Sequence, residues 1–363
     1  MPRTGQHPVQ MTKQSLVTIS HAIEQAALFA ADDSPMVVFG LFQQQVYFER
    51  ERAVYAKIAA QADATVVAGV GLDGAGAPDH LDTVPLRGDE PLAREWSVAV
   101  LTPRFGAVLV ARDLEQVSAA ATLEAGRLFD ATWWFRRDEA LHEVTRLRSV
   151  LGPRLRAGTV AAIDGVLNRA RDLPGASGEL RAEASIRLLA ERLERRERQP
   201  RSAERPDGGT GELTDDRSAQ HWLGDTGTTA AGTLPLALLG IRLQHPHDLP
   251  QRLGRRAETM ATIEVVRVVT AALRPVDRAV RSGDDLLLIL PALAHDDAVA
   301  LANRIADDVA RLQGMHSFVP RMTCVVLVTR DRPVPLERVR AGLDWSVAKG
   351  IPIATLGDSE ARP

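Results

Sequence analysis

The fold of the second half of the chain is decided by one stretch, Arg274-Pro-Val-Asp-Arg-Ala-Val-Arg-Ser-Gly-Asp-Asp-Leu-Leu-Leu-Ile-Leu-Pro291. It contains two short segments with strand character, residues 279–282 and residues 285–290, and Gly283 lies between them. Two such runs separated by a short turn that contains glycine predict a β-hairpin. The flanking elements can therefore be assigned outward from this hairpin.

Outward from the hairpin, helices and strands follow in an order that predicts an α+β domain. Apolar residues at helical spacing predict helices, and short apolar runs predict strands. The expected strands cover residues 234–243, 322–329 and 351–355, and the expected helices cover residues 249–273, 295–313 and 335–349. With the hairpin, this order is typical of a ferredoxin-like α+β layout, with an antiparallel-cored sheet and helices on one face.

The hairpin stretch resembles the signature of GGDEF domains, the diguanylate cyclase family with its nucleotidyl cyclase-type fold. In that family an R-x-x-D precedes an R-Y-G-G-D/E-E-F hairpin, which four apolar residues and a proline follow. Here Arg274-x-x-Asp277 precedes Arg281-Ser-Gly-Asp-Asp-Leu286, which is one glycine short. Farther on, Ala348-Lys349-Gly350 is similar to the family's Y-x-A-K-x-x-G stretch, with Ser346 in place of the tyrosine. The resemblance covers residues 234–357 and implies a degenerate GGDEF-like domain.

The metal chemistry that this resemblance implies depends on carboxylates that the chain lacks. Joining two GTP molecules requires a divalent metal, Mg²⁺, to activate a ribose hydroxyl and to neutralise the phosphates. The family holds the metal with an aspartate of an L-D-I-D-x-F strand and with an acid of the hairpin. This chain reads Leu239-Gly-Ile-Arg-Leu243, so Gly240 offers no ligand and Arg242 repels a cation. The one remaining hairpin acid, Asp284 or Asp285, is a poor site for a hard cation.

Two further departures from the family point in the same direction. The missing hairpin glycine blocks the close backbone approach to phosphate that paired glycines permit. Thr259 stands near the place of the aspartate that recognises guanine in the family. We therefore expect no catalytic residues and no metal, with Gly283, Asp284, Asp285 and Lys349 as vestiges of the family's site. The alternative is a weakly active, Mg²⁺-dependent diguanylate cyclase, which makes cyclic di-GMP from two GTP with Asp284, Asp285 and Lys349.

Arg274, Asp277 and Arg281 have the spacing of the family's inhibitory site for cyclic di-GMP. An arginine suits that role because its planar guanidinium stacks on guanine and binds phosphate in a bidentate manner. The alternative is purely structural: Arg274 lies in the last turn of a helix that Pro275 ends, and Asp277 is exposed. The resemblance thus implies a receptor for cyclic di-GMP or a platform for a partner protein, with GTP as a further candidate ligand.

The amino-terminal segment, residues 14–136, is expected to form an α/β domain. Strands are predicted at residues 35–40, 64–70, 96–101 and 106–111, and helices at residues 16–29, 49–62 and 112–129. Three stretches, Leu41-Phe-Gln43, Tyr47–Arg52 and above all Gly126–Asp138, resemble the DICT sensory domain. The DICT family occurs beside GGDEF and two-component modules, so the resemblance implies a sensory role but no particular ligand. The aromatic residues of the last stretch are expected to pack in the core.

Between the two domains, residues 137–198 predict a helical connector and residues 199–233 predict a flexible linker. Three apolar helical faces, around Val144, Val166 and Leu189, must be buried against some other surface. A homodimer interface and a bundle between the domains are the two candidates. The linker is rich in Gly, Thr, Asp and Ser and has few aliphatic side chains, so it cannot offset its backbone entropy.

Composition excludes several classes of function. The chain has 363 residues and a formal net charge of −3, which argues against nucleic-acid binding driven by bulk charge. No apolar run approaches the roughly 18 residues of a membrane-spanning helix. The polar start lacks a secretory signal, so a cytoplasmic location is expected. Cys324 is the only cysteine, which excludes an intrachain disulfide and a cysteine-based zinc site. The expected protein is a signalling regulator whose downstream partner the sequence does not identify.

Overall fold

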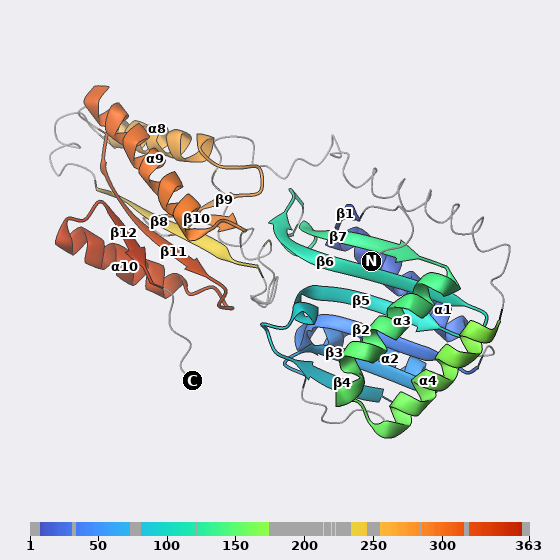
Figure 1. Cartoon of the computed structure of the whole chain (residues 1–363). Helices are drawn as coiled ribbons and strands as arrows, with labels where there is room; N and C mark the ends of the chain where they lie inside the picture. Colours follow the sequence, from blue (N-terminus) through green and yellow to red (C-terminus); the bar gives the residue numbers. More distant parts are fainter. Residues whose placement is uncertain are drawn as a thin grey trace. The chain divides into compact units, whose positions relative to one another are not determined.

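The computed structural model describes residues 8–30, 34–72, 81–120, 122–173, 213, 219, 222, 234–244, 255–282, 285–315 and 319–357. The chain falls into two compact units (Figure 1). Unit 1 comprises Met1–Leu114 and Leu128–Gln199, and unit 2 comprises Glu115–Arg127 and Pro200–Pro363. Most of the expected linker, the last expected connector helix, Gly283 and Asp284 lie outside the described residues. Within the described part, no helix is both long enough and apolar enough to cross a membrane.

Unit 1 is built on a seven-stranded sheet with the strand order β1-β7-β6-β5-β2-β3-β4. Strands β2, β3 and β4 are parallel to one another, whereas β5 is antiparallel to β2 and β6, and β1 is antiparallel to β7. In chain order, the elements are β1 (Val9–Thr12), α1 (Lys13–Phe29), β2 (Val37–Gln44), α2 (Gln45–Ala59), β3 (Ala64–Val70), β4 (Leu81–Leu86), η2 (Pro91–Arg94), β5 (Glu95–Leu101), β6 (Gly106–Val117), β7 (Arg127–Trp134), α3 (Arg137–Leu151), η3 (Gly152–Arg154) and α4 (Ala157–Asp172).

Helices cover both faces of this sheet. Successive side chains of a strand point to opposite faces, and in β2 both sets are buried. Val38 and Phe42 pack in one core with α1 and α2, whereas Phe39 and Leu41 pack in a second core with α3 and α4. Figure 1 shows α3 and α4 on the near side of the sheet. Burial on both sides explains why β2 is a continuous apolar run rather than an alternating one.

The helix expected at residues 112–129 is wrong. Strand β6 continues to Val117, and β7 begins at Arg127. From Ala111 to Asp113 burial alternates as in a strand, and the buried Asp113 carboxylate accepts a hydrogen bond from Gln43 Nε2 at 3.1 Å. Strand pairing and this tertiary contact override the helix-favouring composition of the segment. The edge strands β1 and β4 have no counterpart among the expected strands.

The apolar faces of α3 and α4 are covered by the sheet of unit 1. Val144 and Leu147 of α3, and Ile163 and Val166 of α4, lie in the same buried cluster as Phe39 of β2. For these two helices the sheet itself is the surface that their apolar stripes require, in place of a dimer or a bundle between domains. The boundaries of the connector and of the linker stay predictions.

Unit 2 contains the predicted hairpin within a five-stranded sheet of order β12-β11-β8-β10-β9. Strands β9 and β10 are antiparallel, β8 is antiparallel to β10 and β11, and β12 is parallel to β11. The elements are β8 (Leu236–Gln244), α8 (Arg255–Ala271), β9 (Arg278–Ser282), β10 (Asp285–Pro291), α9 (His295–Met315), β11 (Arg321–Thr329), α10 (Leu336–Lys349) and β12 (Ile353–Leu356). Their order agrees with the α+β layout that the sequence predicts.

The helices of unit 2 cover both faces of its sheet, so the expectation of helices on one face is wrong. Leu239 and Ile241 of β8 pack with α8 and α9, whereas Leu238 lies in the cluster that contains Val339 of α10. Figure 1 shows α8 and α9 on one side of the sheet and α10 on the other. The physical reason is that β8 is buried and apolar on both sides from Leu236 to Ile241, so helices must cover both sides.

Candidate functional site

Gly240 lies in the middle of the sheet of unit 2, where β8 pairs with both β10 and β11. The side chain that it lacks would point toward α10. A Cβ at this position would lie 2.5 Å from Val339 Cγ1 and 3.0 Å from Leu343 Cδ1. Real Cβ atoms are essentially never found 2.5 Å from another side-chain atom, so α10 occupies the space that a carboxylate would need. A side chain larger than that of glycine therefore has no room at this position unless α10 moves.

Arg242, two residues farther along β8, binds the hairpin acid Asp285. The two residues lie directly opposite each other in the β8–β10 ladder. Arg242 Nε donates to Asp285 Oδ1 at 2.7 Å, and Nη2 donates to Oδ2 at 2.8 Å, which makes a bidentate ion pair. Arg242 Nη1 also donates to Asp344 Oδ1 of α10 at 2.6 Å. The hydrogen bonds to Asp285 and then to Asp344 raise the pKa of Arg242, so its guanidinium stays charged.

The space beside Gly240, Ser282 and Asp285 is a cavity of about 20 Å³. Residues of α10, among them Val339, form its other wall. A cavity of this size holds about one water molecule. Arg340 of α10 also donates from Nη2 to Ser282 Oγ at 2.9 Å, across the hairpin. The chain's own side chains therefore fill the surroundings of Gly240.

The other residues that the sequence singles out have fewer defined contacts. Lys349 is the last residue of α10 and is exposed. Gly350 follows it with a φ of 67°, in the left-handed conformation that favours glycine at a helix end. Thr259 lies in α8, and its side chain is outside the described part of the structure, as are Gly283 and Asp284.

Arg274 and Asp277 close the turn between α8 and β9. Asp277 Oδ2 accepts a hydrogen bond from the Arg274 backbone N–H at 2.7 Å, and Oδ1 accepts one from Arg274 Nη2 at 2.8 Å. The same Nη2 donates to the carbonyl oxygen of Pro291 at 2.8 Å, which ties the turn to the end of β10. The Asp277 side chain is 1% exposed, whereas that of Arg274 is 42% exposed. The expectation of an exposed Asp277 is therefore wrong, because its carboxylate is used inside the turn.

Arg281 lies on β9 and is exposed. Its neighbours Ala279 and Val280 are buried in clusters on opposite faces of the sheet. Alternation along the strand places Arg281 on the same face as Ala279, which α8 and α9 cover. The structure thus joins Arg274 to Asp277 and puts Arg281 on the face of the sheet that α8 covers.

Two residues of α10 make contacts that the hairpin motif does not reveal. Arg340 and Asp344 are four residues apart, on one face of the helix, and reach Ser282 and Arg242 respectively. Their helical spacing is visible in the sequence. Nothing local in the sequence shows which strands that face of the helix will meet.

The amino-terminal segment is similar to one known family. Residues 2–114 match the model of the DICT family, described as a sensory domain in diguanylate cyclases and two-component systems. The stretch Gly126–Asp138, which contributes to the resemblance seen in the sequence, lies beyond the matched residues. Among curated proteins, none is significantly similar to the chain.

Several solved structures of GGDEF domains are similar to the chain. One is the GGDEF domain of TpbB (YfiN) from Pseudomonas aeruginosa, with 17% identity and a TM-score of 0.34, covering 40% of this chain and 91% of that one. Another is the GGDEF domain of DgcB from Caulobacter crescentus in complex with c-di-GMP, with 18% identity, a TM-score of 0.35 and coverages of 42% and 95%. A third is the diguanylate cyclase SiaD of Pseudomonas aeruginosa with its activator SiaC, with 17% identity, a TM-score of 0.36 and coverages of 61% and 88%. Both families that the sequence motifs indicate thus appear among these comparisons, and residues 2–114 are similar to the DICT family.

Proposed function

We propose that the chain is a regulatory protein of cyclic di-GMP signalling. The DICT domain is its sensory input, and unit 2 is a GGDEF-like module without cyclase activity that binds cyclic di-GMP or a partner protein. The observation that carries the proposal is the bidentate pairing of Arg242 with Asp285. This pairing supplies the hairpin acid with a counter-ion that belongs to the chain itself.

The electrostatics around Asp285 oppose the metal binding that a cyclase needs. Mg²⁺ requires several oxygen ligands, and Gly240 cannot carry an acid while Val339 fills the adjacent space. To bind Asp285, the ion would have to displace two charge-assisted hydrogen bonds, each worth roughly 1.5–3 kcal/mol. It would also have to approach the positive charge of Arg242. The missing ligand, the hydrogen bonds to be displaced and the charge of Arg242 each weaken metal binding at the hairpin.

A cyclase assay on the purified full chain tests the proposal. The protein is incubated with GTP and either Mg²⁺ or Mn²⁺, with an active diguanylate cyclase as positive control. We expect no cyclic di-GMP above the level of protein-free buffer. Arg242→Ala, which frees Asp285, is also expected to stay inactive because Gly240 still lacks a carboxylate. Steady product formation by the wild-type chain would overturn the proposal in favour of the weakly active cyclase, and Asp285→Asn should then abolish it.

The receptor form of the proposal depends on Arg274. Asp277 and the carbonyl oxygen of Pro291 hold its guanidinium in place, and the side chain is still 42% exposed. A guanidinium that is already ordered can stack on a planar base with little further loss of side-chain entropy. Asp277, by contrast, is buried in the turn, so we expect it to position Arg274 rather than to contact the ligand.

Calorimetric titration of the full chain with cyclic di-GMP tests the receptor form. We expect a saturable heat with the wild type and none with Arg274→Ala. Arg267→Ala is the matched control, because Arg267 of α8, like Arg274, is an arginine that binds an acid three residues away, in this case Glu264. It should bind like the wild type. A wild type without any heat of binding would remove the receptor form and leave the partner-protein form.

A further inference from the structure

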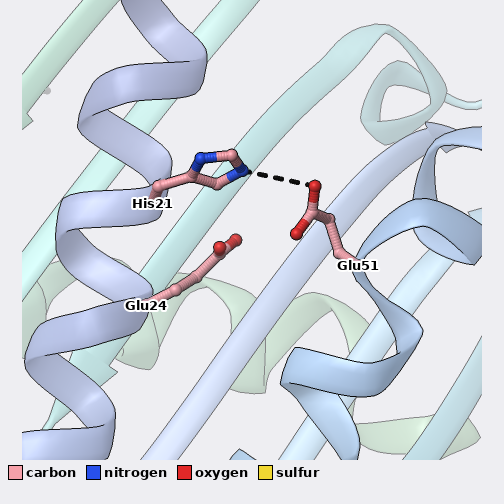
Figure 2. A group of neighbouring side chains, drawn as sticks. All are labelled: His21, Glu24 and Glu51. Atoms are coloured by element: carbon pink, nitrogen blue, oxygen red, sulfur yellow. Dashed lines mark hydrogen bonds and ion pairs between the residues drawn. The ribbon is translucent and has the colours of Figure 1, made fainter.

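Unit 1 contains a separate cluster of metal-ligating side chains, His21, Glu24 and Glu51 (Figure 2). His21 and Glu24 are three residues apart on α1 and share one face of that helix, and Glu51 points toward them from α2. One ligand atom of each residue lies within 4.8 Å of the other two. The distance between His21 Nε2 and Glu51 Oε1 is 3.3 Å. Two neighbouring helices thus direct one imidazole and two carboxylates at the same point.

The three side chains of the cluster differ in how deeply they are buried, and Glu24 is the buried one. Glu24 is 2% exposed, and its Oε1 accepts a hydrogen bond from Ser20 Oγ at 3.2 Å. Burial and, to a lesser extent, the negative charge of Glu51 together raise the pKa of Glu24 to about 7. The side chains of His21 and Glu51 are 50% and 25% exposed. The cluster therefore has a buried acid at its base and two side chains with room to move at its opening.

A buried hydroxyl beside the cluster is an independent observation that points to a ligand. Tyr55 lies on α2, one turn after Glu51, and its side chain is fully buried. Burial raises the pKa of Tyr55, and the nearby charges of Glu24 and Glu51 raise it further. Within the described residues, no hydrogen bond of the hydroxyl oxygen meets the usual geometric limits, although the hydroxyl lies close enough to the Glu24 carboxyl for each group to shift the pKa of the other. Buried polar atoms of this kind are rare in native proteins, and a bound water or ion is one explanation for them.

The backbone of β2 makes room for that hydroxyl. A Cβ at Gly40 would lie 2.5 Å from the Tyr55 hydroxyl oxygen, so any other residue at this position would push the ring away. The fold thus makes room for a buried hydroxyl group next to the two carboxylates.

We propose that His21, Glu24 and Glu51 bind a divalent ion of the Zn²⁺ type, with the Tyr55 hydroxyl beside the bound ion. A mixed set of one imidazole and two carboxylates favours a borderline transition metal. The set suits Ca²⁺ poorly, because Ca²⁺ takes six to eight oxygen ligands. It also suits Mg²⁺ poorly, because Mg²⁺ binds oxygen ligands and keeps several water molecules. Three protein ligands leave one coordination position of a tetrahedral ion open, so the bound ion could hold a further ligand there.

The spacing of the cluster suits such an ion. Four ligands held about 2.1 Å from a tetrahedral metal have donor atoms about 3.4 Å apart. His21 and Glu51 already have this separation, at 3.3 Å. Both are partly exposed, so small rotations bring them to Glu24, which its buried position holds in place. The ion also offsets the repulsion between the two carboxylates.

Calorimetry of the chelator-treated full chain with Zn²⁺ tests the site, with Mg²⁺ and Ca²⁺ in parallel arms. We expect saturable binding of one Zn²⁺ per chain in this cluster, and at least tenfold weaker binding of Mg²⁺ and Ca²⁺. His21→Ala and Glu51→Gln, at partly exposed positions, should each weaken Zn²⁺ binding at least tenfold. Glu49→Gln and His142→Ala are the matched controls, since both alter an exposed residue of the same type outside the cluster, and they should bind like the wild type.

A Co²⁺ titration adds a spectroscopic readout, because the visible absorption of Co²⁺ depends on its donor atoms. We expect new bands with the wild type and a changed spectrum with His21→Ala, in which the nitrogen donor is lost. Circular dichroism verifies that each variant is folded. The proposal is overturned if the wild type has no saturable Zn²⁺ site, if the cluster variants bind as tightly as the controls, or if Mg²⁺ or Ca²⁺ binds more tightly than Zn²⁺. None of these measurements involves GTP or cyclic di-GMP.

Discussion

Glu24 keeps its proton to higher pH in the folded chain than in the unfolded chain. Burial raises its pKa from 4.5 to about 7, so between these values unfolding releases a proton. A rise in pH therefore favours the unfolded state throughout this range, and the stabilisation present below pH 4.5 is lost as pH approaches 7. A pKa difference of this size corresponds to roughly 3 kcal/mol.

Glu24→Gln should remove this pH dependence, because glutamine has the same size and does not titrate. In chelator-treated protein, we expect the free energy of unfolding of the wild type to fall more steeply between pH 4.5 and 7 than that of the variant. Urea unfolding at a series of pH values measures both curves, and their difference isolates the contribution of this one carboxyl group. Parallel curves would contradict the prediction.

Gly240 is a second residue whose effect depends on the space around it. We expect Gly240→Ala to destabilise unit 2 by about 1–3 kcal/mol, because the new methyl group overpacks against Val339. Adding Val339→Ala should restore part of the loss. Gly314→Ala is the control, since no atom lies within 4 Å of the place of its Cβ. Chemical denaturation measures all four proteins, and equal stabilities of Gly240→Ala and Gly314→Ala would show that α10 yields freely.

Secondary structure elements could be predicted where each carries its own pattern. The hairpin strands β9 and β10 and the helices α9 and α10 all lie where the sequence places them. Which face an element covers is not a local property: α10 lies opposite α8 and α9 because both sides of β8 are apolar. Residues 112–129 have helix-favouring composition, but residues 112–117 and 127–129 pair within the sheet as parts of β6 and β7.

The candidate sites could be predicted only in part, because they join distant elements. The motif indicates Asp285 as an acid, but Arg242 reaches it from 43 residues away through the β8–β10 register. In unit 1, the spacing of His21 and Glu24 on one helix is visible in the sequence. Glu51, 30 residues from His21, joins them only through the packing of α1 against α2.

The turn between α8 and β9 is expected to depend on the carboxylate of Asp277. Asp277→Ala removes the acceptor of the Arg274 backbone N–H and of its guanidinium, which leaves that backbone group without its partner. Because Arg274 is partly exposed, we expect a loss of about 2 kcal/mol rather than the larger cost of a fully buried pair. Asp307→Ala, at an exposed position of α9, should change the stability little. Urea denaturation compares the two, and an equal effect of both substitutions would contradict the role of Asp277.

At the scale of the whole molecule, association of two chains needs a surface other than the inner faces of α3 and α4, which the sheet of unit 1 covers. The apolar residues Ile186, Leu189 and Leu193 lie outside the described residues, and their helical spacing remains the basis of the predicted homodimer.

Light scattering on the full chain tests this dimer. We expect a dimer for the wild type and a monomer for the double variant Ile186→Asp and Leu189→Asp, because buried charge opposes association. The double variant Arg187→Asp and Arg195→Asp introduces the same side chains at polar positions of the segment and should stay dimeric. A wild type that is monomeric at every concentration would show the prediction to be wrong.

Arg242 differs from a free divalent ion in that it is covalently part of the chain. A free ion associates and dissociates as its concentration changes, whereas a guanidinium tethered to β8 is always present next to Asp285. The positive charge beside Asp285 is therefore supplied by the chain itself, whether or not a divalent ion is available.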